Sequence, residues 1–279
     1  MLPESAIDLV VICTGPRHAR ALGFVMAKRK RASFGLFNGF FGKLATDLSV
    51  AVAVSGNSEG AAHACLRQMA YLFGQVPVVG FGAAISLAEN THAGDVVLIH
   101  STRRCFCPAA ITEEMFSSDS WVFPSERVRK NVLESPFQPD GSLIVSASEH
   151  LCANPPHLSL QSKFPGFRFG SMPAEDLPRR GREYLKQRFE IEMVDATSYG
   201  LISAANAAGV ASLLISIVEE APGESLVALR RRDRARFEKA AAQAVAAAAA
   251  RIPSLTELLP QEDCAGISIP RPEASKHAP

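Results

Sequence analysis

Residues 48–99, LSVAVAVSGNSEGAAHACLRQMAYLFGQVPVVGFGAAISLAENTHAGDVVLI, decide the fold of this chain. Residues 50–54 form an apolar, β-branched run that predicts a buried strand. Residues 60–73 then carry apolar side chains at helical spacing, and 76–81 and 96–99 predict two further buried strands. Strand, helix and strand within about 35 residues are the crossover unit of a parallel sheet.

Small residues stand where the predicted strands end. Gly82 and Ala83 follow the strand at 76–81, and Gly15 follows another buried-strand pattern at 7–13. Because open α/β sheets bind ligands at the carboxyl ends of their strands, we expect these three residues to line a ligand site.

Other segments complete the predicted architecture. Residues 142–146 and 213–218 are apolar runs too continuous for a sheet with a wet face, so we expect one mixed, mostly parallel sheet flanked by helices. Helices are expected at 125–133 and 226–251. The basic run at 28–31 is interpreted as a solvated helix end, and 34–41 as a strand or hairpin with exposed aromatic residues.

Length and composition indicate one domain. The chain has 279 residues, 47% of them apolar, and a formal net charge of +1, so no nucleic-acid partner and no membrane surface are expected. We expect a domain at 1–252 and a disordered Pro-rich tail at 253–279. No basic leader precedes the first apolar segment, and Cys13 and Cys65 fit buried thiols of a reducing, cytoplasmic compartment. The pair Cys105 and Cys107 lacks a second pair for zinc, so no metal is expected.

Three motifs in order carry a family resemblance. They are V-S-G-x-x-x-G-A-A at 54–62, V-G-x-G-A-A at 79–84 and A-G-D-V-V at 93–97. Together they resemble the nucleoside phosphorylase and nucleosidase superfamily over roughly residues 8–252. The uridine phosphorylases and the methylthioadenosine nucleosidases are the most similar branches, with the uridine phosphorylases closest in appearance. The resemblance implies a three-layer α/β/α fold, no cofactor, a homodimer or higher oligomer, and cleavage of the bond between ribose C1′ and the base of a nucleoside.

Several phosphate-binding positions of that family are changed here. Uridine phosphorylases have G-D-P-x-R after the first strand, where this chain has G-P-R-H-A-R at 15–20, so Arg20 or Arg17 could substitute. Surface arginines at a helix start are the alternative. The positions that resemble two further phosphate-binding arginines hold Gly42 and Gly80, which argues against phosphorolysis.

The ribose-binding motif E-M-E is also changed. One register matches Glu192 and Met193 and puts valine at the second glutamate. The other places Asp195 at the first glutamate and Thr197 at the second. In either register the glutamate that would bind the ribose hydroxyls is absent.

Two residues match other site positions. Glu220 falls where purine-cleaving members have the acid that protonates the leaving base; a solvated Glu219-Glu220 pair is the alternative. His150 matches a residue that packs on the base, although a lone histidine is more often simply hydrogen-bonded. We therefore expect Asp195 and Glu220 as candidate catalytic groups.

The resemblance implies a nucleoside phosphorylase-like glycosyltransferase of nucleoside catabolism or salvage, with weak or altered activity. Its substrate would be a nucleoside, with phosphate or water as acceptor. The alternative is a pseudoenzyme that binds a nucleoside or nucleotide, or serves as a structural subunit.

Overall fold

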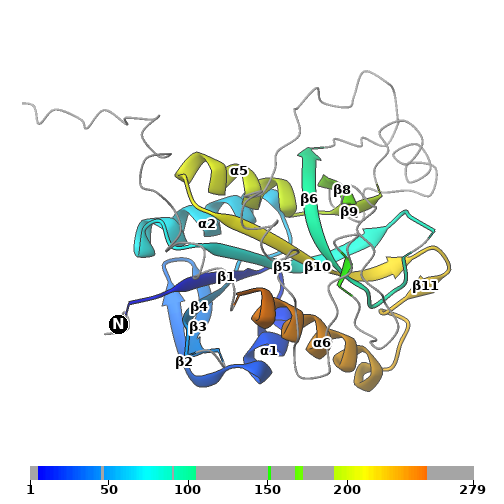
Figure 1. Ribbon diagram of the computed structural model, residues 1–279, viewed down its shortest axis with the longest axis horizontal. Coiled ribbons are helices and arrows are strands. Elements are labelled where there is room, and N and C mark those ends of the chain that lie inside the picture. The colour runs from blue at the N-terminus through cyan, green and yellow to red at the C-terminus, as the bar shows by residue number, and fades with distance from the viewer. Residues whose placement is uncertain are drawn as a thin grey trace, which may run out of the picture.

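A mixed β-sheet forms the centre of the computed structural model (Figure 1), which describes residues 6–44, 47–89, 91–104, 150–151, 167–171 and 192–249. The sheet order is β11-β10-β6-β8-β9-β5-β1-β4-β3-β2, with β7 paired to β6. The strands are β1 (Leu9–Cys13), β2 (Ala27–Phe34), β3 (Phe37–Lys43), β4 (Ser49–Val54), β5 (Val78–Ser86), β6 (Val96–Arg104), β7 (His150–Leu151), β8 (Phe167–Ser171), β9 (Met193–Asp195), β10 (Ser212–Ala221) and β11 (Glu224–Ser225).

The central strands are parallel. β1 pairs with β4 on one side and with β5 on the other, and β5 also pairs in parallel with β10. The predicted strands at 7–13, 50–54, 76–81, 96–99 and 213–218 are thus confirmed as members of one sheet. The predicted strand at 142–146 lies outside the described residues.

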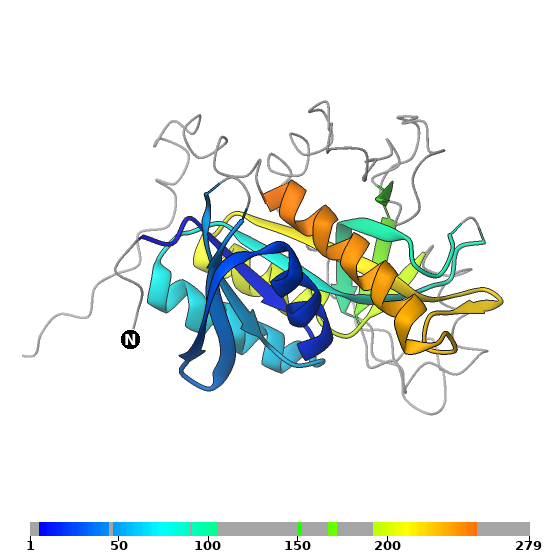
Figure 2. The same ribbon diagram turned by 90° about the horizontal axis from the view of Figure 1, so that it is seen from below.

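Helices cover both faces of this sheet. α1 (Pro16–Val25) and α6 (Arg231–Ala249) contact each other on one face, and α2 (Glu59–Phe73) and α5 (Ser198–Ala208) on the other (Figure 2). Along β1, Leu9, Val11 and Cys13 pack toward α1 and α6, while Val10 and Ile12 pack toward α2 and α5. Because both faces are buried, the strands read as continuous apolar runs. The three-layer α/β/α prediction is confirmed.

Five strands close into a ring of pairings. β5 pairs with β10, β10 with β6, β6 with β8, β8 with β9, and β9 returns to β5. The ring joins segments far apart in the sequence, and it brings the ends of β5, β9 and β10 together.

Local predictions need four corrections. β5 continues to Ser86, so Gly82 and Ala83 lie inside a strand, because β9 and β10 extend its pairing. Residues 28–31 belong to the exposed edge strand β2 and not to a helix end. The β2–β3 hairpin is present, but Phe34 and Phe41 are buried against Phe73 of α2. The last helix begins at Arg231, five residues later than expected.

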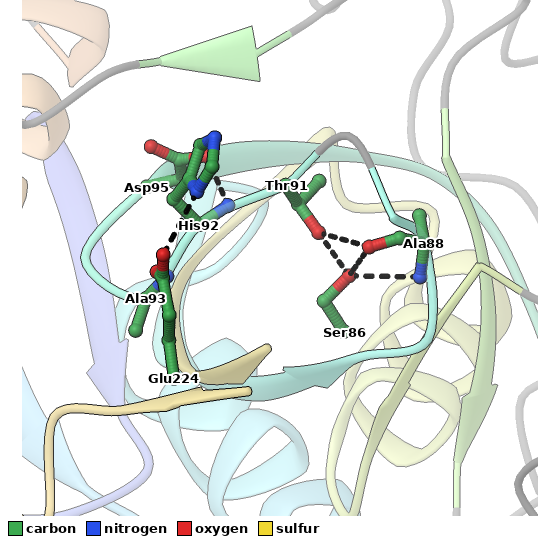
Figure 3. A network of polar contacts seen from close by, with 7 residues as sticks. All are labelled: Ser86, Ala88, Thr91, His92, Ala93, Asp95 and Glu224. Atoms are coloured by element: carbon green, nitrogen blue, oxygen red, sulfur yellow. Dashed lines mark hydrogen bonds and ion pairs between the residues drawn. The ribbon is translucent and has the colours of Figure 1, made fainter. Parts of the chain in front are cut away.

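The connection between β5 and β6 is held by side chains (Figure 3). Ser86 Oγ, at the end of β5, contacts Thr91 Oγ1 and accepts a hydrogen bond from the backbone N–H of Ala88 at 3.1 Å. Nearby, Glu224 of β11 accepts from the backbone N–H of Ala93 at 2.9 Å and pairs with the His92 ring at 3.1 Å. The contacts of Ser86 hold the carboxyl end of β5, and those of Glu224 hold the turn that leads into β6.

The cysteine prediction is confirmed for Cys13 and Cys65, which are buried free thiols. Burial raises the pKa of both thiols, that of Cys65 to about 12, so neither is reactive. The C-x-C pair, the helix expected at 125–133 and the tail at 253–279 lie outside the described residues. Of the helices described, none combines the length and apolar character needed to cross a membrane.

Candidate functional site

A cavity of about 380 Å³ opens at the carboxyl ends of the central parallel strands, a size suited to a small ligand. It is lined by residues after β1 and β4, on the first turn of α1, and at the ends of β5, β9 and β10: Thr14, Gly15, Pro16, Arg17, His18, Asn57, Ala83, Ala84, Ile85, Val194, Asp195, Ala196, Glu219 and Glu220. The cavity therefore lies at the sheet edge where ligands were expected.

The first turn of α1 brings two basic side chains to the cavity. Gly15 is the N-cap residue in an extended conformation, and Pro16 occupies the first turn, where its missing N–H costs nothing. Arg17 and His18 follow directly and both line the cavity. The sequence G-P-R-H thus places two nitrogen-bearing side chains at the end of β1.

His18 is buried and incompletely paired. It is 2% exposed, its Nδ1 lies 3.4 Å from Thr14 Oγ1, and its ring packs on Phe81 at a centroid distance of 5.1 Å. Its Nε2 is buried and has no hydrogen-bond partner within the described parts of the chain. Buried polar atoms are usually paired, so this nitrogen is a candidate for contact with a ligand or water.

Glu219 faces this histidine because β10 contains a bulge. Val218 pairs with Ala84 and Glu220 with Ile85, which leaves Glu219 as an extra residue. In a regular strand these neighbouring glutamates would point to opposite faces, but with the bulge both line the cavity.

Two neighbouring side chains, Arg17 and His18, control the charge of Glu219. Its Oε1 forms an ion pair with the Arg17 guanidinium and lies 3.8 Å from His18 Nε2. Burial alone raises the pKa of this carboxyl, but His18 and Arg17 together outweigh that effect and hold the pKa below its ordinary value. Glu219 is therefore an anion at neutral pH, and the charge of Arg17 is already balanced.

Asp195 has a different environment at the start of α5. Its carboxylate accepts hydrogen bonds from the Ser198 backbone N–H at 2.9 Å, Ser198 Oγ at 2.6 Å and Thr197 Oγ1 at 3.1 Å. Burial raises its pKa to about 6, because these hydrogen bonds offset only part of the desolvation cost. Asp195 therefore exchanges protons close to neutral pH.

The structure brings together some of the predicted site residues and separates others. Gly15, Ala83, Asp195 and Glu220 all line the cavity. Arg20 does not: it is exposed on the next turn of α1 and lines a separate groove.

Three further predicted residues lie behind the cavity wall. Gly82 packs on Thr14, whose side chain stands where a Cβ would be. Met193 is fully buried, and Thr197 is 2% exposed with its hydroxyl turned to Asp195. These are corrections to the predicted pocket lining, and each follows from packing between neighbouring elements.

The remaining predicted positions lie elsewhere in the sheet. Glu192 is half-buried ahead of β9, where its carbonyl oxygen accepts a hydrogen bond from Leu87. His150 belongs to β7, where its backbone pairs with Val97 of β6. Gly80 lies in the middle of β5, with Leu201 and Leu214 each 3.0 Å from where a Cβ would be, so no arginine fits there.

Sequence reasoning missed His18 and Glu219 as functional candidates. His18 lies between the two arginines of G-P-R-H-A-R, and Glu219 lies beside Glu220 in a sequence that is equally typical of a solvated pair. The available signal was a polar run directly after a buried strand in each case, at 14–18 and at 219–220.

Comparison with known proteins agrees with the fold. Residues 8–254 match the phosphorylase superfamily, and the chain therefore belongs to that superfamily of nucleoside phosphorylases and nucleosidases. No curated protein matches the chain.

Three of the similar solved structures are two nucleosidases and a hydrolase. A 5′-methylthioadenosine/S-adenosylhomocysteine nucleosidase from S. pneumoniae is 14% identical, with a TM-score of 0.65 over 88% of this chain and 99% of that one. The futalosine hydrolase of Helicobacter pylori is 12% identical, with a TM-score of 0.65 over 87% and 97%. A nucleosidase from Neisseria meningitidis is 16% identical, with a TM-score of 0.61 over 88% and 97%. At these identities the similarity shows the fold.

Proposed function

We propose that the cavity binds a nucleoside and hydrolyses its N-glycosidic bond, slowly and with water as the acceptor. The observation that carries the proposal is the divergence of two carboxyl groups that line one cavity: the pKa of Asp195 is raised to about 6, whereas that of Glu219 is lowered. Carboxyl groups with pKa values pushed apart in this way are typical of two groups that take different roles in one reaction, one as a proton donor and one as a stabilising anion.

The proposed reaction assigns a role to each group. Protonated Asp195 donates its proton to the leaving base as the C1′–N bond breaks and its electron pair moves to the base. The Glu219 carboxylate stabilises the positive charge that develops on the ribose ring. With its Nδ1–H donating to Thr14 Oγ1, His18 presents a lone pair on Nε2 that takes a proton from the attacking water, whose oxygen bonds to C1′. The resulting imidazolium lies beside Glu219.

Charge in the cavity supports water over phosphate as the acceptor. Among the described residues, the lining carries three carboxyl groups, of Asp195, Glu219 and Glu220, against one guanidinium, that of Arg17, which is already paired with Glu219. A phosphate dianion entering this site would face net repulsion. The uridine phosphorylase-like expectation is therefore retained for the fold but replaced by hydrolysis for the reaction.

The ribose side of the site supports a low rate. In the register that places Asp195 at the first glutamate of the family motif, the second glutamate is replaced by Thr197, which is buried and donates its hydroxyl to Asp195. Removing one such electrostatic contact costs about a hundredfold or more in rate.

The test is to measure base release from a panel of ribonucleosides, including uridine, inosine and methylthioadenosine, with and without phosphate. We expect slow release of free ribose at a rate independent of phosphate, reduced about a hundredfold or more in Asp195→Asn and in His18→Gln. His63→Ala, a histidine of α2 outside the cavity lining, is the matched control and should retain the rate. Formation of ribose 1-phosphate would contradict the proposal.

A second candidate function is nucleoside binding without turnover. It is favoured by Asp195, whose oxygens already accept three hydrogen bonds at the start of α5. A nucleoside that raises the melting temperature but releases no base on prolonged incubation would identify this function.

A further inference from the structure

A cationic groove lies on the other side of the first turn of α1 from the cavity. The groove has a volume of about 810 Å³, and its charged lining residues are Arg20 of α1 and Lys30 and Arg31 of β2. Polar Ser33 and Asn38 and the ring of Phe40 complete its β2–β3 wall. Among the residues that the structure describes, no acidic residue contributes to its lining.

The three cations of this groove have no carboxylate partner in the described parts of the chain. This separates them from Arg17, which is paired with Glu219, and from Lys43 of the same hairpin, which lies 3.5 Å from Asp47. Charged residues on an edge strand commonly prevent edge-to-edge pairing. Protection of the strand edge would explain Lys30 and Arg31. It does not explain why Arg20, which belongs to the separate helix α1, lines the same groove.

The groove and the cavity are adjacent. Pro16 lines both of them. The segment after β4 also contributes to both, with Val54 in the groove and Asn57 in the cavity. A ligand that fills the cavity and extends past Pro16 would therefore enter a region of opposite charge.

We propose that the ligand of this protein is a nucleotide, whose nucleoside part occupies the cavity and whose phosphate group binds Arg20, Lys30 and Arg31 in the groove. The inference rests on the proposed function and adds the substrate class. Guanidinium groups bind phosphate oxygens through paired, charge-assisted hydrogen bonds, and an unpaired cation gains most from such an anion. The anionic cavity lining repels a phosphate, so the phosphate is placed outside the cavity.

The experiment compares each of the four ribonucleoside 5′-monophosphates with its parent nucleoside, by calorimetric titration of the full chain. We expect at least one monophosphate to bind at least tenfold more tightly than its nucleoside. In the double variant Lys30→Gln/Arg31→Gln this ratio of affinities should fall by about tenfold. Lys43→Gln, which removes a paired lysine of the same hairpin outside the groove, should leave the ratio unchanged. Light scattering on each variant checks that the oligomeric state is constant.

Each other outcome overturns the proposal in a recognisable way. Equal affinity for nucleoside and monophosphate refutes the groove but leaves the proposed function intact. Absence of binding by both classes refutes the proposed function and this inference together. If the nucleoside plus inorganic phosphate reproduces the effect of the monophosphate, the groove is a site for free phosphate. If a short oligoribonucleotide binds more tightly than any monophosphate, and binds His18→Gln equally well, the groove is a nucleic-acid surface.

Discussion

Asp195 and Glu219 line the same cavity, but their surroundings at the ends of two strands shift their carboxyl pKa values in opposite directions. At the end of β9, Asp195 is enclosed by hydroxyl and amide donors with no cation, and burial raises its pKa to about 6. At the end of β10, Glu219 meets Arg17 and His18, and its pKa is lowered despite burial. A neutral donor set reduces the desolvation cost of an anion only in part, whereas a nearby cation reverses its effect on the pKa.

The environment of Asp195 depends on the position of α5, because Ser198 at the start of this helix donates hydrogen bonds to the Asp195 carboxylate. Gly200 in α5 packs so closely on α2 that an added Cβ would lie 2.3 Å from the Glu59 carbonyl oxygen. We expect Gly200→Ala to lower the free energy of unfolding by about 3 kcal/mol, because backbone must move. The measurement is urea denaturation.

Gly60 of α2 provides the control for this substitution. Nothing lies within 4 Å of the position of its Cβ, so Gly60→Ala should be neutral or stabilising by about 0.5 kcal/mol. Equal stability losses in the two variants would show that the contact between α2 and α5 does not fix the Asp195 region.

The raised pKa of Asp195 makes stability depend on pH in an unusual direction. Its folded pKa of about 6 lies above the ordinary aspartate value of 3.8, so the folded state holds the proton more tightly. The stability that this group contributes is present below about pH 4 and is lost as the pH rises toward 6, by up to about 3 kcal/mol. Relative to Asp195→Asn, the wild type should therefore lose stability across this interval.

Urea denaturation of both proteins between pH 4 and 7 measures that difference. Only its change with pH is diagnostic, because the asparagine also alters the hydrogen bonds at the start of α5. A wild type that gains stability over the variant as the pH rises would show that the donors stabilise the anion more than burial destabilises it.

Replacing Arg17 tests how far its positive charge controls the pKa of Glu219. Arg17→Gln should lower the free energy of unfolding by about 1 kcal/mol, a modest amount because a third of the Arg17 side chain is exposed to solvent. It should also raise the pKa of Glu219, which loses the guanidinium that stabilises its anion. Denaturation at neutral pH and an NMR titration of the Glu219 carboxyl measure the two effects.

Glu219→Gln and the double variant complete a thermodynamic cycle for this pair. The coupling energy should be favourable to the pair. A coupling energy of zero would mean that Arg17 does not control the charge of Glu219.

The smallest effect is expected at the exposed pair of Glu224 and His92 (Figure 3). The backbone N–H of Ala93, with help from the His92 ring, lowers the pKa of Glu224, so its contribution is present at neutral pH and is lost as the pH falls through that pKa. Glu224→Gln should change stability less than Arg17→Gln, as measured by the same denaturation assay, because solvent screens the pair. A larger loss would indicate that the β5–β6 connection controls the end of β5 near the cavity.

Much of the fold could be predicted because both sheet faces are buried. The runs at 9–13 and 50–54 carry apolar residues at every position, and the run at 213–218 does so except at Ser216, which indicates strands covered on two sides. The basic run at 28–31 carries no such pattern. Its sequence is therefore equally compatible with an exposed edge strand and with a solvated helix end. The continuation of β5 through Gly82 depends on pairing with β9 and β10, which no local pattern encodes.

The site was predictable where it depends on strand ends and unpredictable where it depends on packing. Gly15, Asp195 and Glu220 come directly after or at the ends of strands, so their place in the cavity follows from topology. The role of Glu219 depends on a single-residue bulge, and that of His18 on a tertiary contact with Phe81. Neither leaves a signature in the spacing of residues.

The ring of strands around β5 has a consequence for biosynthesis. As the chain leaves the ribosome, β5 pairs with β1 on one edge, but its other edge stays open until β9 and β10 have been made far later in the chain. An open strand edge is a template for pairing with other chains. Chains that stop before Ser212 will therefore be prone to aggregation, and no truncation that removes β10 will yield the cavity.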